Sequence, residues 1–198
     1  MTTSNALLDK LALHDVVQSW ALYRDTGDWE GLQSTLHPSA HMTATWFDGP
    51  FTDFILAVKA SWRKGSSSQH FLGGTVSQIV GDKAIAQTRM TIMVRGALEG
   101  LEVDVSCVGR FYDRVVKVGG EWKILKRNVI YEKDRMDLVN PGALLELDAQ
   151  KLAQFPEGYR HLAYLQSSHG AQVSPHLATA QGDAFDRLLQ EAQAWIYS

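Results

Sequence analysis

The sequence contains a single cysteine, Cys107, among its 198 residues. An intrachain disulfide is therefore impossible, and such sparse cysteine usage is typical of proteins in a reducing compartment. The N-terminus lacks the basic segment followed by an apolar run that a secretory signal peptide needs. No apolar run approaches the length of a membrane span either. These absences predict a cytoplasmic protein without a membrane partner.

Charge of one sign is also not concentrated anywhere in the chain. The 19 basic and 22 acidic residues give a net charge of -3, and no Lys/Arg cluster is interleaved with aromatic residues. This pattern argues against a nucleic-acid partner. His37 and His41 are four residues apart, but Pro38 interrupts any helix that would align them. No nearby acid or cysteine completes a ligand set, so we expect no metal site.

Apolar residues in the first 62 positions mostly recur at helical spacing. They predict a helix over about residues 5–24, a short helix capped by Asp28 that ends at His37-Pro38, and a third helix that Thr52 caps. Between the second and third helices, alternation over residues 42–46 predicts a short strand that closes at Asp48-Gly49. A chain that is 45% hydrophobic can bury a substantial core around such elements.

A loop at residues 65–68 precedes a change of the apolar period to two. Strands are expected over residues 69–80, 83–95, 101–118 and 121–132. The short glycine-containing turns between them predict antiparallel neighbours. Gly73-Gly74 falls within a strand pattern and indicates a bulge or bend rather than a phosphate-binding loop. The predicted fold class is α+β: a cone-shaped, curved antiparallel sheet whose concave face is covered by the N-terminal helices. The opening between helix and sheet is a natural ligand pocket.

The chain changes character at about residue 133. Three prolines punctuate segments of helical spacing, notably Leu144 to Leu152 and Phe185 to Trp195. We therefore divide the chain into a cone domain at 1–132 and a helical C-terminal extension at 133–198. The extension packs either on the domain or on a neighbouring subunit, and the sequence does not choose between them.

Asp25 and His70 are the residues most suggestive of chemistry. Asp25 lies at the end of the first helix and His70 opens the first long strand, two places that are adjacent at the pocket of such a cone. A carboxylate that accepts a hydrogen bond from one ring nitrogen fixes the tautomer, so that the other nitrogen can take a substrate proton. The alternative is a capping aspartate beside a half-buried histidine. Cys107 has no histidine near it in sequence, which indicates a buried, inert thiol.

Three segments carry a resemblance to a known family: Asp25-Thr26-Gly27-Asp28-Trp29, Gln69 to Thr75, and Glu121 to Arg127. They resemble the SnoaL-like branch of the nuclear transport factor 2-like superfamily, in particular its group of scytalone dehydratase, γ-hexachlorocyclohexane dehydrochlorinase and bile-acid 7α-dehydratase. The resemblance covers about residues 5–132. It implies a cofactor-free lyase in which Asp25 and His70 form a proton-abstracting pair and Arg127 closes the site. It also implies a homo-oligomer, since relatives with this pair tend to be trimers and the wider superfamily is often dimeric.

The sequence departs from that group at the positions of its other catalytic side chains. Trp20 replaces a lysine or tyrosine and Arg24 replaces a tyrosine, while the second histidine falls near Val94 and the pocket asparagine near Phe111. The base is therefore retained while the groups that help the leaving group are replaced. This puts the particular elimination in doubt and leaves proton abstraction intact.

Two kinds of anionic partner are possible for Arg127. Leu125, Arg127, Val129 and Tyr131 share one predicted strand face, so the guanidinium needs an anionic partner among apolar neighbours. That partner is either a substrate anion or one of three acids, Asp104, Asp113 and Glu132. Aromatic side chains and one arginine are candidates for the pocket wall, with plain hydrophobic core as the alternative for the aromatic ones. The wall candidates are Trp20, Tyr23, Arg24, Trp46, Phe111 and Tyr131.

Three functional hypotheses follow. The first is a cofactor-independent lyase of the dehydratase or eliminase type that acts on a small hydrophobic or polycyclic substrate. The second is an isomerase or cyclase that uses the same base, which the loss of lysine or tyrosine at Trp20 favours. The third is a non-catalytic binding or assembly protein, because this cone hosts many functions. An outer sheet face rich in aromatics and valines predicts a homo-oligomer, since such a face needs cover.

Overall fold

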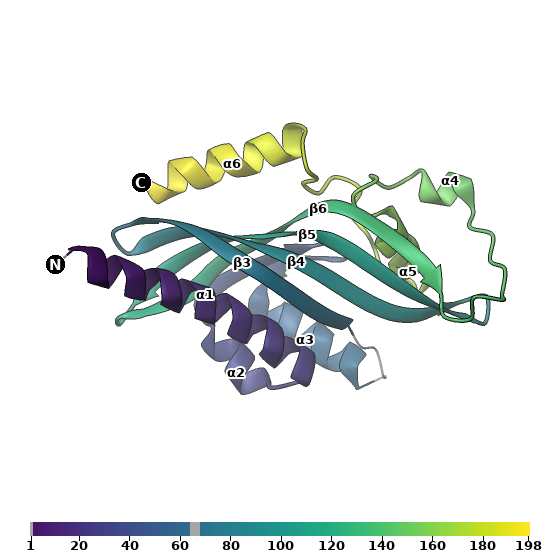
Figure 1. The fold of residues 1–198 in the computed structure, drawn as a ribbon, viewed down its shortest axis with the longest axis horizontal. Coiled ribbons are helices and arrows are strands. Elements are labelled where there is room, and N and C mark those ends of the chain that lie inside the picture. The colour runs from purple at the N-terminus through teal and green to yellow at the C-terminus, as the bar shows by residue number, and fades with distance from the viewer. Residues whose placement is uncertain (1, 64–67) are drawn as a thin grey trace.

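A computed structural model describes residues 2–63 and 68–198, with side chains described from residue 5 onward. It has the predicted α+β architecture, in which a curved sheet is covered by helices (Figure 1). The N-terminal elements are α1 (Thr2–Thr26), α2 (Trp29–Ser34), β1 (Leu36–Ala44), β2 (Phe47–Pro50) and α3 (Phe51–Trp62). The long strands are β3 (Ser68–Val80), β4 (Lys83–Leu98), β5 (Leu101–Val118) and β6 (Glu121–Leu138). The C-terminal helices are α4 (Ala149–Leu152), α5 (Arg160–Ser168) and α6 (Asp183–Ile196). Residues 65–67 of the predicted loop lie outside the described residues.

The six strands form one sheet in the order β2-β1-β6-β5-β4-β3. The four long strands are antiparallel neighbours, as their short turns predicted. The β1 strand lies parallel to β6, a pairing between strands far apart in sequence that no turn could have predicted. The fold class is thus confirmed, with one parallel pair added to it.

Three register shifts interrupt the long antiparallel ladders and help the sheet to curve. The first lies between Leu72 and Thr75, so the bulge predicted at Gly73-Gly74 is confirmed. Another falls beside Leu125 on β6, which is left out of register. Because this bulge shifts the alternation, Ile124 joins the main core in place of Leu125. The predicted strand face of four residues is wrong in that one member.

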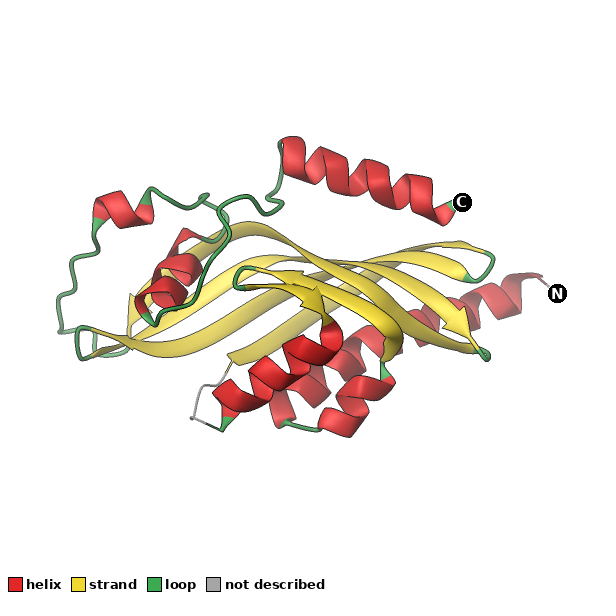
Figure 2. Cartoon of the chain, turned by 180° about the vertical axis from the view of Figure 1, so that it is seen from behind, coloured by secondary structure: helices red, strands yellow, loops and turns green. Residues whose placement is uncertain are grey.

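Helices cover both faces of the sheet (Figures 1 and 2). Residues of α1, α3 and α5 pack in one core cluster with β1, β4, β5 and β6. On the opposite face, α6 buries Leu188, Ala192 and Ile196 against Ile85, Tyr112 and Ile130. The C-terminal extension therefore packs on its own domain. It also covers part of the outer sheet face, while Phe71 and Met93 stay exposed, so the expected homo-oligomer stays a prediction.

Several predicted boundaries differ from the observed ones. The α2 helix ends at Ser34, and His37-Pro38 lies within β1, at an irregularity where a proline is tolerated in a sheet. Asp28 caps α2 as predicted, through its side-chain bond to the Gly31 amide. Pro50 rather than Thr52 is the cap residue of α3. The β6 strand continues past residue 132 to Leu138, because it keeps its partner β5 along the whole length.

Candidate functional site

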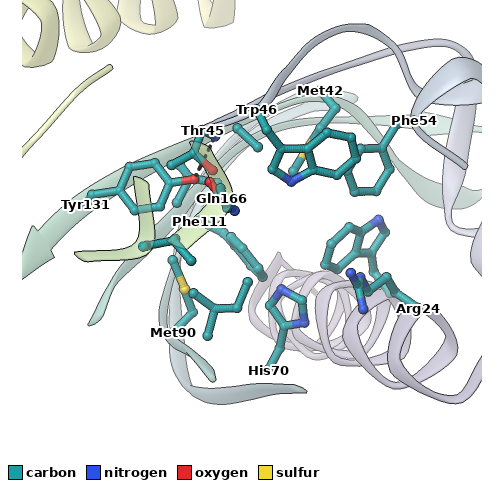
Figure 3. A pocket seen from close by; sticks show the side chains of 15 residues that line it. Arg24, Met42, Thr45, Trp46, Phe54, His70, Met90, Phe111, Tyr131 and Gln166 are labelled. Carbon is teal, nitrogen blue, oxygen red and sulfur yellow. Dashed lines mark hydrogen bonds between the residues drawn. The ribbon is translucent and has the colours of Figure 1, made fainter. Parts of the chain in front are cut away.

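A cavity of about 40 Å³ lies on the face of the sheet that α1, α3 and α5 cover (Figure 3). Its walls come from α1, α3 and α5 together with the four strands β1, β4, β5 and β6, and His70 of β3. Such a volume has room for only a few water molecules. The lining residues are Trp20, Arg24, Met42, Ala44, Thr45, Trp46, Phe54, His70, Met90, Ile92, Phe111, Val129, Tyr131, Leu162 and Gln166.

Asp25 and His70 form a two-point contact beside this cavity. The His70 Nδ1 lies 2.8 Å from the Asp25 Oδ1, and the His70 backbone amide donates to Oδ2 at 2.6 Å. Asp25 thus fixes both the backbone and the ring of the same residue. The aspartate itself does not line the cavity, whereas His70 does. If Nδ1 bears the hydrogen toward the carboxylate, Nε2 is left as a free acceptor.

Aromatic neighbours desolvate the imidazole. The ring centroid of His70 lies 5.6 Å from that of Trp20 and 5.9 Å from that of Phe111, and the side chain is 6% exposed. Burial lowers the pKa of His70 below its usual value near 6.5, and the hydrogen bond to Asp25 opposes this only in part. The neutral imidazole is therefore the resting form at pH 7. A neutral, oriented imidazole is competent to accept a proton.

Among the described residues, Arg24 is the one arginine in the cavity wall. Its Nη1 donates to the Asp25 Oδ1 at 3.4 Å and to the Ser68 carbonyl at 3.3 Å. Within residues 5–63 and 68–198, Nε and Nη2 make no hydrogen bond. Burial lowers the pKa of Arg24, and Asp25 opposes that shift. The guanidinium thus lies at the same end of the cavity as His70 (Figure 3).

Arg127 and Tyr23 do not line the cavity. Arg127 forms a fully buried, two-point ion pair with Asp113, at 2.7 Å from Nε to Oδ1 and 2.6 Å from Nη2 to Oδ2. Of the three candidate acids, Asp113 is thus the partner. The guanidinium carbon lies 4.1 Å from the ring centroid of Trp20 and 3.9 Å from that of Phe111. Arg127 therefore supports two wall residues from behind, and its contact with a substrate stays a prediction.

A second polar group lies away from His70, on another side of the cavity (Figure 3). The Tyr131 hydroxyl accepts a hydrogen bond from the Thr45 amide at 3.2 Å. Burial raises the pKa of Tyr131, so its hydroxyl stays protonated. Gln166 also lines the cavity, and its buried Oε1 has no partner in the described part of the chain. Trp20 Nε1 is likewise buried without a partner.

Five of the predicted wall residues line the cavity: Trp20, Arg24, Trp46, Phe111 and Tyr131. The sequence reading missed several others. Met90 and Ile92 share one strand face, so the two-residue period of β4 held a signal for them. Leu162 and Gln166 come from α5, and no local pattern connects that helix with His70, about 90 positions earlier. The Cys107 thiol is buried as predicted, and burial raises its pKa.

Comparisons with known proteins agree with this architecture. The SnoaL-like domain model matches residues 5–128. A PEP2-like protein of Fusarium vanettenii is 34% identical, over 96% of this chain and 86% of its own. Among solved structures, a putative scytalone dehydratase from Novosphingobium aromaticivorans has a TM-score of 0.56 at 20% identity, covering 74% of this chain and all of its own. A type 2 hexachlorocyclohexane dehydrochlorinase has a TM-score of 0.55 at 17% identity, covering 73% of this chain and 97% of its own.

These structural likenesses concern the fold, because the identities are low. The family match runs from within α1 to the first part of β6 and includes Asp25, His70 and Arg127, but it excludes α5 with Leu162 and Gln166. No described helix is both long and apolar enough to cross a bilayer. With its domain match, its relative of similar length and its curved, helix-covered sheet, the chain belongs to the SnoaL-like domain family.

Proposed function

We propose that this protein is a cofactor-independent lyase that removes a proton from a carbon next to a carbonyl group and expels a leaving group from the adjacent carbon. One observation carries the proposal: a buried histidine, hydrogen-bonded to an aspartate through Nδ1, lines an internal cavity. Two structural neighbours, a putative scytalone dehydratase and a hexachlorocyclohexane dehydrochlorinase, agree with this reaction class. Because the sequence identity to these neighbours is low, the proposal rests on the geometry of the site.

The proposed reaction uses three side chains. His70 Nε2 takes the proton, and Asp25 holds Nδ1–H and stabilises the imidazolium that forms. The electron pair of the broken C–H bond moves to the carbonyl oxygen, where Arg24 donates to the developing enolate. As the enolate collapses, a carbon–carbon double bond forms and the bond to the leaving group breaks. A departing hydroxide takes the proton back from His70 and leaves as water.

We assign the charge-stabilising role to Arg24 instead of Arg127. Arg24 lines the cavity, whereas Arg127 does not, and the Arg127 charge is matched by Asp113 although its Nη1 is buried without a partner among the described residues. A charge-assisted donor inside a desolvated site is worth more than the same donor in water. This exchange of roles is the main change from what the family resemblance implied.

The cavity volume bears on the choice of substrate. At about 40 Å³ it is much smaller than the 300–1,000 Å³ of typical ligand sites. A single six-membered ring requires some outward movement of a wall, and a polycyclic substrate requires a larger one. The proposal therefore favours the small hydrophobic substrate over the polycyclic one.

An isomerase or cyclase is the second candidate, and a specific observation favours it. Apart from Asp25 behind His70, no carboxylate and no second histidine adjoins the cavity among the described residues, so the same base must return the proton. Return to a different carbon gives an isomer of unchanged mass. A binding protein without catalysis, the third hypothesis, has no need for an imidazole oriented by an acid.

The proposal is tested by proton exchange in D₂O with a panel of small β-hydroxy ketones, for example 4-hydroxybutan-2-one and 3-hydroxycyclohexanone. Proton NMR follows loss of the α-proton signal, and mass spectrometry follows loss of water. We expect wild-type protein to accelerate exchange and His70→Ala to remove the acceleration, with His14→Ala, a variant of an exposed histidine, as the control. Elimination of water identifies the lyase, and formation of an isomer with new proton signals but no loss of water identifies the isomerase. Equal exchange rates for wild type and His70→Ala would refute both.

A further inference from the structure

We propose that the cavity end formed by Gln166 and Tyr131 recognises a hydroxyl group on the substrate, at the end of the molecule opposite to the carbon that loses its proton. This inference rests on the proposed function, and it narrows the substrate to a small molecule with oxygen at both ends. Figure 3 shows why two ends can be distinguished: Gln166, Thr45 and Tyr131 lie on one side of the cavity, and His70 and Arg24 lie on another.

The first argument is the unpaired amide of Gln166. Its Oε1 is buried without a hydrogen-bond partner in the described part of the chain, while the residue lines the cavity. A buried acceptor without a partner costs about 1–3 kcal/mol. A side chain that tolerates this cost at a cavity wall is suited to accept a hydrogen bond from a ligand. An apolar residue of the same size would fill the position more stably.

The second argument is the nature of the group that fits. Tyr131 accepts from the Thr45 amide and remains protonated, so its hydroxyl hydrogen is available as a donor. A substrate hydroxyl both donates and accepts, so it can donate to Gln166 Oε1 and accept from Tyr131. It also matches either orientation of the amide, because it can accept from Nε2 in place of donating to Oε1. A carbonyl or an ether oxygen can only accept.

The third argument is that α5 is held in place, which preorganises Gln166. The Asp134 carboxylate accepts from the Leu162 amide and contacts His161 Nδ1, both at 2.8 Å. At the other end of α5, the His169 ring contacts the Ala97 carbonyl at 2.9 Å. A Cβ on Gly96 would lie only 2.9 Å from Leu165 Cδ1, so this glycine permits the close packing of helix on strand. Fixing the helix from both ends reduces the entropy that binding would cost.

The α5 helix lies outside the part of the chain that the family domain matches. Gln166 lies in the C-terminal extension, beyond the residues 5–128 that the family domain matches. The base thus comes from the shared domain, and the proposed recognition of the hydroxyl comes from the extension. The extension would then set substrate specificity, and proteins that share only the domain would lack it.

The test compares 4-hydroxycyclohexanone with cyclohexanone, which differ only by a hydroxyl group opposite the carbonyl. Binding is measured by tryptophan fluorescence, since Trp20 and Trp46 line the cavity. We expect wild type to bind the hydroxylated probe about tenfold more tightly, as one good hydrogen bond implies. In Gln166→Met, and in Gln166→Leu as a second apolar variant, this ratio should fall to near one.

A thermal measurement separates recognition from a structural role. Because Gln166→Met removes a buried unpaired acceptor, it should raise the melting temperature by roughly 2–12 °C. The exposed Gln154→Met is the matched control on the same extension and should leave the melting temperature unchanged. A merely structural glutamine would instead destabilise the protein when replaced.

The outcomes distinguish this inference from the proposed function. His70→Ala should lose proton exchange and keep the tenfold binding ratio. Exchange by wild type with a binding ratio near one overturns the inference alone, and a tenfold ratio without any exchange overturns the proposed function alone. Failure of wild type to bind 4-hydroxycyclohexanone, or an unchanged ratio in both Gln166 variants, also overturns the inference.

Discussion

The chain contains a natural comparison between two cross-strand arginine–aspartate pairs. Arg127 lies directly opposite Asp113 on neighbouring strands, and Arg95 lies directly opposite Asp104. Both pairs make two hydrogen bonds between 2.6 and 2.8 Å. The side chains of the first pair are 0% exposed, whereas those of Arg95 and Asp104 are 57% and 44% exposed. The two pairs thus differ mainly in burial.

We predict that Asp113→Asn lowers the free energy of unfolding by about 3–5 kcal/mol, because it leaves the Arg127 charge buried without a counter-charge. For a chain of this length, this corresponds to a fall of roughly 6–20 °C in melting temperature, at 2–4 °C per kcal/mol. Asp104→Asn, the exposed counterpart, should leave the unfolding midpoint nearly unchanged because solvent screens that pair. Urea unfolding followed by tryptophan fluorescence measures both variants.

We can also predict the sign of the net contribution that the Asp113–Arg127 pair makes to the free energy of unfolding. Burial raises the pKa of Asp113, and Arg127 opposes this only in part, so desolvation outweighs attraction. The double variant Asp113→Leu/Arg127→Met should therefore recover most of the stability that Asp113→Asn loses. If Asp113→Asn loses no more than Asp104→Asn, the reasoning from burial is refuted. A double variant less stable than Asp113→Asn would contradict the account of desolvation.

Three further predictions concern the site and the extension. The acidic limb of the pH–activity profile should titrate below pH 6.5, because the pKa of His70 is lowered in the folded protein. The unfolded chain therefore binds a proton at His70 before the folded chain does, and the free energy of unfolding should fall as the pH drops through 6.5. NMR titration of the His70 ring measures this pKa. Asp25→Asn should slow proton exchange about 10²–10⁴-fold with the fold retained by circular dichroism, whereas Asp28→Asn, at the α2 cap, should leave the rate unchanged. Asp134→Ala removes the two contacts of this carboxylate with α5 and should destabilise the docking of the helix by about 1–3 kcal/mol. Proteolysis between residues 139 and 159 should then be faster. An unchanged cleavage rate would contradict the proposal that Asp134 anchors α5.

Elements whose signal is local could be predicted from the amino-acid sequence. Apolar periodicity predicted α1 and the four long strands, and short glycine turns predicted that these strands are antiparallel, because each signal acts over a few residues. The sequence also indicated that Asp25 and His70 meet, since a helix end and a strand start adjoin in this type of cone. That contact is present at 2.8 Å.

Tertiary structure alone decided which distant segments share the cavity. The parallel pairing of β1 with β6, the choice of Asp113 among three acids for Arg127, and the position of Gln166 in the cavity wall all join elements through packing. No turn or short period relates such elements, because their contacts depend on how whole helices and strands dock on the sheet. The histidine that we propose as the base could therefore be predicted from the sequence. The wall opposite it, which comes from α5, depended on the folded chain.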